Sequence, residues 1–227
     1  GQNTIVLAYL DGIQVARTIY DTLTAPNEDA EFVPFLAKSV TPNATFDSWD
    51  IELRDGVKFH DGSDLTAEVV KNNLDAFRGL YPGRNALIAS FVLGNIASVE
   101  VTGPLSVRVT TKTPWKALPS VLYYSGRAGV MAQAQLDNAE SCDRELIGTG
   151  PFKLVEWRLN EALTTVRNED YWQTDADGKQ LPYLDSIEYR PVVEGPTRVN
   201  SLLGDELQAI HTSGGAQIEE LRLATNE

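Results

Sequence analysis

Residues 47–70 read DSWDIELRDGVKFHDGSDLTAEVV, and this stretch predicts a strand, two tight turns and the start of a helix. The apolar residues Trp49, Ile51 and Leu53 alternate with polar ones, which is typical of a strand with one buried face. Two Asp-Gly pairs follow, and Asp-Gly supplies the left-handed backbone that tight turns require. The segment therefore predicts compact local architecture.

The helix that follows has both a start signal and a buried face. The side chain of Thr66 can accept a hydrogen bond from the first helical turn, and Glu68 lies where the helix dipole favours a negative charge. Val70, Leu74 and Phe77 share one side of this helix.

The same stretch carries a family resemblance. The run LRDGVKFHDGSDLTAEVV resembles the signature of extracytoplasmic solute-binding proteins of peptide ABC transporters, of the family 5 type. Four further pieces agree in order and spacing: IYDTLTAPNEDAEFVPFLAKSVTPN, TKTPWKALPSV, GTGPFKLVEWRLNEALTTVRNEDYW and LPYLDSIEYRPVVEGPTRVNSLLGDELQAI. The resemblance covers the chain from about Ile19 to Ile210.

The resemblance implies an α/β fold: a periplasmic-binding-protein-like lobe, with a mixed sheet and flanking helices. It assigns residues 1–44 plus 146–227 to this first ligand-binding lobe, and residues 45–145 to an inserted, hairpin-rich α+β domain. Members of the family are longer, so we expect an N-terminal portion that lacks the second lobe. The implied function is binding of peptides for delivery to an ABC permease in the membrane, without catalysis.

Charge and composition restrict the partners. A formal net charge of −13 argues against nucleic acid, which needs clustered Lys and Arg, and predicts repulsion from an anionic membrane. No run of apolar residues approaches the length of a membrane span. Cys142 is the single cysteine, so no internal disulfide can form, and a free thiol is the simplest interpretation. The resemblance implies an extracytoplasmic location, periplasmic or at the cell surface, and a secretion signal with or without a lipidated cysteine.

Periodicity predicts further elements along the chain. We expect a first strand over residues 4–10, a loop at Asp11-Gly12, and a helix to Leu23. Later segments are expected as a hairpin over 99–109, a helical piece over 115–124 interrupted by proline, strands over 152–158, 162–167, 186–193 and 207–212, and helices from Pro196 to Gly204 and around Ile218. The strand–helix–strand order at residues 186–212 favours a parallel pair with a right-handed crossover.

Two candidate ligand sites follow from strand ends, because ligands of α/β sheets sit at the carboxyl ends of strands. The first comprises Asp11, Gly12 and Ile13, where Asp11 either pairs with a ligand amino group or caps the next helix. The second comprises Thr212, Ser213 and Gly214, before a helix whose free N–H groups suit a carboxylate or a peptide carbonyl. The alternative for the second site is an ordinary turn with a helix cap.

A third candidate is the glycine-rich loop of Tyr124, Ser125, Gly126 and Arg127. Arg127 is suited to bidentate binding of a peptide carboxylate at the edge of a cleft. Aromatic residues such as Tyr124 more often belong to the core, and this alternative stays open.

Motifs for catalysis, phosphate or metal are weak. The GTGP run at 148–151 precedes a predicted strand and lacks the Gly-Lys-Thr element of a phosphate loop. The loop 173–178 echoes a calcium loop, but positions one and twelve would be Gln173 and Leu184. His60 and His211 have no neighbouring ligand at metal spacing, so neither a cofactor nor a metal is expected.

Several alternatives to peptide binding stay open at this point. A related binding protein would carry an oligosaccharide, a nickel complex or an opine. An extracytoplasmic hydrolase is the alternative from another class, although no catalytic motif supports it. A freestanding sensor or adhesin domain is a third.

Overall fold

The computed structural model describes residues 10–138, 140 and 144–225. Their contacts form two compact units. The first unit contains the chain up to Trp157 together with Thr164–Ile187, and the second contains Arg158–Leu163 and the chain from Glu188 onward. These units do not test the predicted division into a first lobe (residues 1–44 plus 146–227) and an inserted domain (residues 45–145). That division stays a prediction.

The described residues form short helices and strands. The helices are α1 (Leu10–Ile19), α2 (Ala67–Phe77), α3 (Ile88–Val92), α4 (Leu118–Tyr123), the 3-10 helix η1 (Tyr124–Gly126), α5 (Gln133–Asp137), α6 (Gly195–Leu203) and α7 (Gly215–Thr225). The strands are β1 (Thr24–Pro26), β2 (Phe32–Pro34), β3 (Ala37–Pro42), β4 (Ser48–Leu53), β5 (Ile96–Gly103), β6 (Ser106–Thr111), β7 (Phe152–Arg158), β8 (Ala162–Arg167) and β9 (Ser186–Tyr189).

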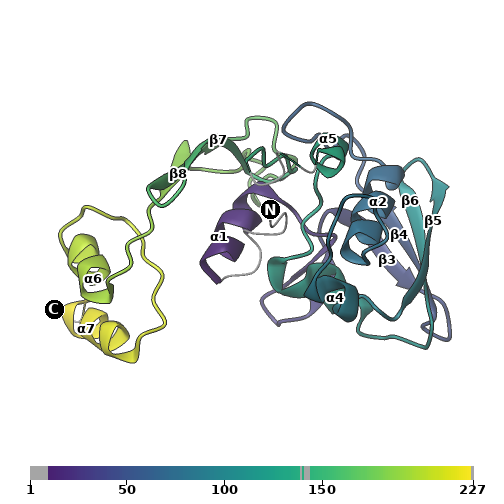
Figure 1. Ribbon diagram of the computed structural model, residues 1–227, viewed down its shortest axis with the longest axis horizontal. Helices are drawn as coiled ribbons and strands as arrows, with labels where there is room; N and C mark the ends of the chain where they lie inside the picture. The colour runs from purple at the N-terminus through teal and green to yellow at the C-terminus, as the bar shows by residue number, and fades with distance from the viewer. Residues whose placement is uncertain (1–9, 139, 141–143, 226–227) are drawn as a thin grey trace. The chain divides into compact units, whose positions relative to one another are not determined.

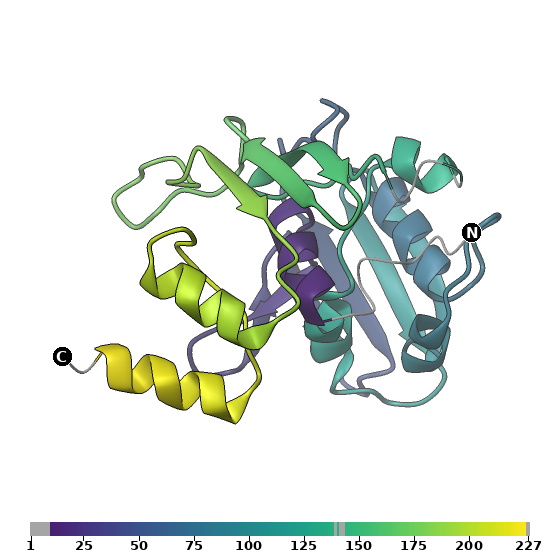
Figure 2. The same cartoon turned by 60° about the vertical axis from the view of Figure 1, so that its left-hand side comes forward.

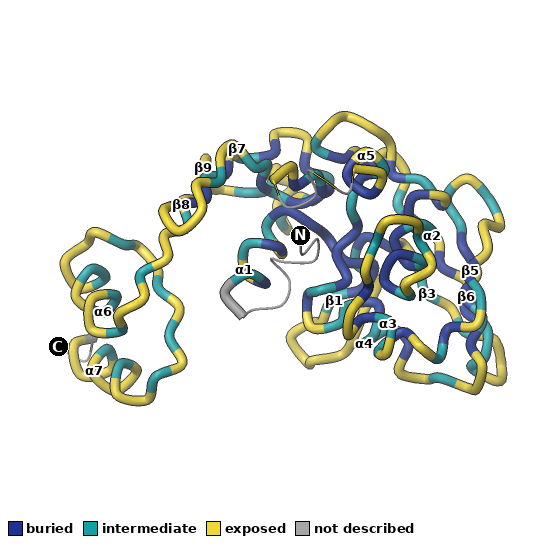
Figure 3. The backbone as a smooth tube through the Cα atoms, viewed as in Figure 1, coloured by how far each residue is buried: buried dark blue, intermediate teal, exposed yellow. Residues whose placement is uncertain are grey.

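A four-stranded antiparallel sheet in the order β3-β4-β6-β5 carries the main core (Figure 1). The hairpin predicted over residues 99–109 is confirmed as β5 and β6, in which Val101 pairs with Val107 and Val99 with Val109. Helix α2 packs on this sheet, and buried residues gather along both (Figure 3). The remaining strands form a two-stranded sheet, β1-β2, and a three-stranded sheet, β7-β8-β9.

The predictions for residues 47–70 are confirmed. Strand β4 buries Trp49, Ile51 and Leu53, each at most 3% exposed. Both Asp-Gly turns have a glycine at positive φ. Thr66 caps α2, since its hydroxyl accepts a hydrogen bond from the Val69 N–H at 3.3 Å. Local signals were sufficient here because each acts within a few residues.

The beginning of the chain differs from the prediction. The expected strand lies outside the described residues, apart from Leu10, which begins α1. The expected loop at Asp11-Gly12 is wrong, because both residues belong to α1, and the helix ends at Ile19 rather than Leu23. Ile13, Ala16 and Ile19 recur at helical spacing and are buried, and this apolar face favours a helix over a turn.

Glycines allow the end of α1 to lie against the GTGP segment. A Cβ atom at Gly150 would lie 2.6 Å from the carbonyl carbon of Ile19, and one at Gly148 would overlap the Ile19 oxygen. The Gly150 N–H donates to the Ile19 carbonyl at 2.9 Å. Strand β7 follows this segment, as predicted, and not the helix that a phosphate loop would precede. The two glycines instead allow close backbone packing.

A buried carboxylate fixes the same corner. Asp21 is 3% exposed and accepts hydrogen bonds from Thr149 Oγ1 at 3.0 Å, Trp172 Nε1 at 2.8 Å and Tyr171 OH at 3.2 Å. Burial raises the pKa of Asp21 to about 6, although the three donors act in the opposite direction. We call Asp21, Thr149, Tyr171 and Trp172 the Asp21 cluster. It joins the residues after α1 to segments more than 120 positions later.

The second unit is a helical pair with little core of its own. Helices α6 and α7 run side by side (Figures 1 and 2), and Val199 is fully buried. As predicted, α6 has Pro196 in its first turn and ends at Gly204, and α7 forms around Ile218. Strand β9 is shorter than expected, ending at Tyr189.

The predicted strand over residues 207–212 is wrong, and so is the parallel pair that it would complete. This segment is irregular in the structure, and no strand among the described residues pairs with it. A strand needs a neighbour for its backbone groups, so a segment without such a neighbour remains a loop.

The helical piece expected over residues 115–124 also differs in detail. Helix α4 begins at Leu118, so Pro119 lies in its first turn and does not interrupt it. Proline is tolerated there because the first N–H groups of a helix have no partner within it.

Candidate functional site

The loop after α4 has an unusual backbone. Tyr124 (φ 43°, ψ 53°), Ser125 (φ 55°, ψ 32°) and Gly126 (φ 80°) are three successive residues in left-handed conformation. For a non-glycine residue this conformation costs about 1–2 kcal/mol. Strain of this kind concentrates at ligand-binding and switch segments, because the surrounding structure must hold it in place. The loop predicted as a ligand site is therefore also a strained one.

Helix α1 packs directly on this loop. A Cβ atom at Gly126 would lie 2.8 Å from Cδ of Arg17 and 3.3 Å from Cγ2 of Ile13. Glycine at position 126 is thus required both by its φ angle and by the approach of α1. The structure brings together two predicted groups, Ile13 from the first and Gly126 from the third. Gly12 precedes Ile13 in the same helix, and the side chain of Asp11 lies outside the described residues.

Two guanidinium groups lie over tyrosine rings at this loop. Arg127 lies 5.7 Å from the ring centroid of Tyr124, and Arg17 lies 5.6 Å from that of Tyr123. Stacking on an aromatic face restricts the orientation of a guanidinium group. Phe32 extends the aromatic group, with its ring centroid 5.7 Å from that of Tyr123. We call Arg17, Tyr123, Tyr124 and Arg127 the Arg-Tyr group.

Arg17 was missed by the sequence predictions. It stands one helical turn after Ile13, so the i, i+4 rule for helices places both on one face. That spacing gives a shared face, but the packing of this face on Gly126 depends on a contact between distant parts of the chain.

The second predicted group, Thr212, Ser213 and Gly214, lies in the second unit. The Thr212 hydroxyl donates to Oε1 of Gln217 and accepts from the Gly214 N–H at 3.3 Å, and α7 begins at Gly215. Ser213 lies between these residues without secondary structure. This arrangement is that of a helix-start turn, and its ligand role stays a prediction.

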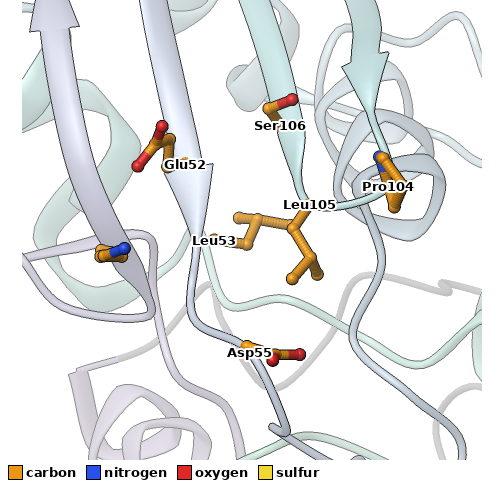
Figure 4. Close-up of a pocket in the computed structure, with 7 residues that line it drawn as sticks. Glu52, Leu53, Asp55, Pro104, Leu105 and Ser106 are labelled. Atoms are coloured by element: carbon orange, nitrogen blue, oxygen red, sulfur yellow. The ribbon is translucent and has the colours of Figure 1, made fainter.

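Two surface cavities lie elsewhere on the first unit. One of about 320 Å3 is lined by Lys38, Glu52, Leu53, Asp55, Pro104, Leu105 and Ser106, and Leu53 and Leu105 face each other inside it (Figure 4). The other, of about 420 Å3, is lined by His60, Asp61, Arg144, Glu145, Leu146, Ile147, Lys153, Leu154 and Val155. Neither cavity is lined by a predicted ligand residue.

His60 has a structural setting. Its Nε2 lies 2.9 Å from the Gly150 carbonyl oxygen, and its Nδ1 accepts from the Gly148 N–H at 3.4 Å. Burial lowers the pKa of His60 to about 4, so the ring is neutral at pH 7. The histidine thus supports the GTGP segment.

No group of three or more His, Cys, Asp or Glu side chains in the described part of the chain is arranged to hold a metal ion. In the loop that echoes a calcium site, the Asp175 carboxylate accepts from the N–H groups of Asp177 and Lys179 and from Tyr183 OH. Within the same described residues, no helix has the length and apolar character needed to cross a membrane.

Comparison with known proteins identifies the family. Residues 31–227 match the family model of bacterial extracellular solute-binding proteins, family 5 Middle. The glutathione-binding protein GsiB of Salmonella paratyphi A is 34% identical over 194 residues, which make up 86% of this chain and 36% of GsiB. The chain therefore spans little more than a third of that relative.

Solved structures agree on the fold. The binding protein AgaA of A. tumefaciens R10, in complex with agropinic acid, is 26% identical with a TM-score of 0.77 over 91% of this chain and 40% of AgaA. A dipeptide-binding protein of Pseudoalteromonas sp. SM9913, in complex with Met-Leu, is 20% identical with a TM-score of 0.82 over 97% of this chain and 46% of that protein. The second likeness concerns the fold alone. The predicted mixed α/β fold is confirmed, and the chain belongs to the family 5 bacterial extracellular solute-binding proteins.

Proposed function

We propose that this chain forms the first lobe of an extracytoplasmic peptide-binding protein that delivers its ligand to an ABC permease. Residues 1–44 plus 146–227 form that lobe in the proposal, and residues 45–145 are the inserted domain. The Asp21 cluster supports joining the two parts of the lobe, since its hydrogen bonds run from residue 21 to residues 149, 171 and 172. The proposal includes a location outside the cytoplasm, with lipid anchoring as one form of it.

The observation that carries the proposal is the Arg-Tyr group on a strained loop. An extended peptide needs a charged group to hold its terminal carboxylate. Arg127 is half-buried and stacked on Tyr124, and Arg17 is exposed beside the same loop. In a chain with 32 acidic and 19 basic residues, two guanidinium groups against one loop favour an anionic group as ligand.

The other predicted ligand residues belong to the proposal in lesser roles. Gly12 and Ile13 lie in α1 beside the loop, and Asp11 precedes them in the same helix. Thr212, Ser213 and Gly214 directly precede α7 and are the remaining candidates. A second lobe closes over the ligand and excludes water, as in hinge closure around other ligands.

The relatives favour a peptide without deciding among solutes. GsiB is named for glutathione, which is a tripeptide, and the dipeptide-binding protein was solved with Met-Leu. AgaA was solved with agropinic acid, so an opine is the second candidate. NikZ of Campylobacter jejuni, 26% identical with a TM-score of 0.72, was solved with Ni(L-His), so a nickel complex is a further candidate.

Isothermal titration of the 227-residue chain with di- and tripeptides tests the proposal. Since the proposed groove has walls from two lobes, we expect this chain to bind a peptide weakly, with a Kd above the micromolar range. A Kd at or below 1 µM, about −8 kcal/mol, would contradict the shared groove. Hydrolysis of the peptides during the titration would favour the hydrolase.

A further inference from the structure

Charge is unevenly distributed along the chain. Residues 76–136 contain six Arg and Lys residues and one acidic residue, Glu100, so their net charge is +5. The remaining 166 residues contain 13 basic and 31 acidic residues, with a net charge of −18. The whole basic segment lies in the first unit. At physiological salt, charges interact over about 8 Å, so a ligand surface responds to the local charge and not to the net −13.

The basic segment also carries a group of exposed apolar side chains. Leu80, Leu87, Ile88 and Phe91 are 63%, 55%, 69% and 86% exposed, and we call them the α3 patch. Ile88 and Phe91 lie in α3, Leu87 directly precedes it with a positive φ of 45°, and Leu80 follows the end of α2. The end of α2 lies close to this segment, since a Cβ atom at Gly79 would lie 3.5 Å from Cβ of Ala86 and 3.9 Å from Cβ of Ser90. Several large apolar side chains exposed in one short segment indicate an interaction surface.

Cations flank the α3 patch and bond mainly to backbone carbonyls. Lys112 Nζ donates to the Gly94 carbonyl at 2.7 Å, just after α3. Arg84 Nε donates to the Leu136 carbonyl at 2.8 Å. A carbonyl oxygen orients a cation without cancelling its charge, so positive charge remains beside the apolar side chains.

The negative charge of Asp75 is paired with two positive charges. Asp75 pairs with Arg78 Nη1 at 2.6 Å and with Lys71 Nζ at 2.9 Å. Arg78 also donates to the Ala97 carbonyl at 2.8 Å, at the start of β5. Two cations on one carboxylate leave this side of the patch positive as well.

We propose that the α3 patch docks this protein onto an anionic lipid surface. Apolar side chains that enter the interface and basic side chains that meet lipid phosphates are the two components of peripheral membrane binding. Lys112 and Arg84 place positive charge beside the α3 patch, which complements lipid phosphates and favours an anionic lipid surface as the occupant.

Co-sedimentation of the 227-residue chain with vesicles tests the proposal. Vesicles of phosphatidylcholine and phosphatidylglycerol at 3:1 are compared with pure phosphatidylcholine, at 50 and 500 mM NaCl. The wild type is expected to bind the anionic vesicles, and high salt is expected to weaken that binding. The double variant Ile88→Ser/Phe91→Ser should reduce the partition coefficient at least tenfold, because both side chains lose their interfacial burial. Lys112→Gln should reduce it about fivefold.

Val193→Ser is the matched control, because Val193 is 84% exposed in the second unit. It should bind as the wild type does. The proposal is overturned if the wild type does not bind anionic vesicles, or if the double variant, with unchanged circular dichroism, binds them equally well. It is also overturned if sedimentation velocity shows that the patch joins two copies of the chain, through a wild-type dimer that the double variant abolishes.

Discussion

Asp21 and His60 should make opposite contributions to the pH dependence of stability. The pKa of Asp21 is about 6 in the fold against 3.8 in the unfolded chain, so the folded state binds the proton more tightly. Its contribution to the free energy of unfolding is therefore present at low pH and is lost as the pH rises from about 4 to 6. The pKa of His60 is about 4 against 6.5, so its contribution is present above pH 6.5 and is lost as the pH falls toward 4.

The two magnitudes are similar. At 1.36 kcal/mol for each pKa unit, each group corresponds to about 3 kcal/mol across its window. The windows overlap almost completely, so the two contributions should nearly cancel in the wild type. Single variants should reveal them. Asp21→Asn leaves the His60 contribution, so its free energy of unfolding should increase between pH 4 and 6.5 by about 2–3 kcal/mol relative to the wild type.

His60→Gln should show the reverse slope, and the double variant should return to the slope of the wild type. Urea denaturation followed by tryptophan fluorescence at pH 4, 5, 6 and 6.5 measures these differences. Asp177→Asn, at an exposed carboxylate, is the control and should keep the slope of the wild type. The reasoning is refuted if Asp21→Asn and His60→Gln shift the slope in the same direction, or if neither changes it.

Three further predictions concern local structure, and each is measured as a free energy of unfolding in urea. Gly150→Ala should destabilise the fold by at least about 2 kcal/mol, because its Cβ would lie 2.6 Å from the Ile19 carbonyl carbon. Gly215→Ala, where a Cβ meets open space, should be neutral or slightly stabilising. Equal effects of the two substitutions would contradict the close packing at Gly150. Ser125→Gly should stabilise by about 1 kcal/mol by relieving the left-handed conformation, and a loss of stability would mean that φ 55° is not strained there. Thr66→Ala should cost about 1 kcal/mol through the lost cap of α2 while Thr66→Ser restores it, and an unchanged Thr66→Ala would show that the cap does not matter.

Sequence reasoning succeeded where the physical cause is local. The strand, turns and capped helix of residues 47–70 depend on neighbours within four positions, and the structure has them as predicted. The hairpin of β5 and β6 follows from alternation around Gly103-Pro104. The start of α1 was wrong because Asp-Gly is a strong turn signal, and the buried face of Ile13, Ala16 and Ile19 outweighed it.

The missed features depend on contacts between distant positions. The Asp21 cluster joins residue 21 to donors 128 to 151 positions away, and no periodicity announces such a pair. Arg17 belongs to the candidate site only because α1 packs on Gly126. Residues 207–212 were predicted as a strand but have no neighbouring strand in the described part of the structure.

The central claim is that the Arg-Tyr group binds the carboxylate of a peptide. A chemical-shift titration of the isotopically labelled chain with a tripeptide, and with the same tripeptide amidated at its C-terminus, tests it most directly. We predict saturable shifts around residues 123–127 with the free acid, at least tenfold weaker binding of the amide, and no difference between the two peptides in Arg127→Gln. Arg108→Gln, at an exposed pair with Asp50, should preserve the preference for the free acid. Equal binding of acid and amide by the wild type, or shifts confined to other parts of the chain, would contradict the claim.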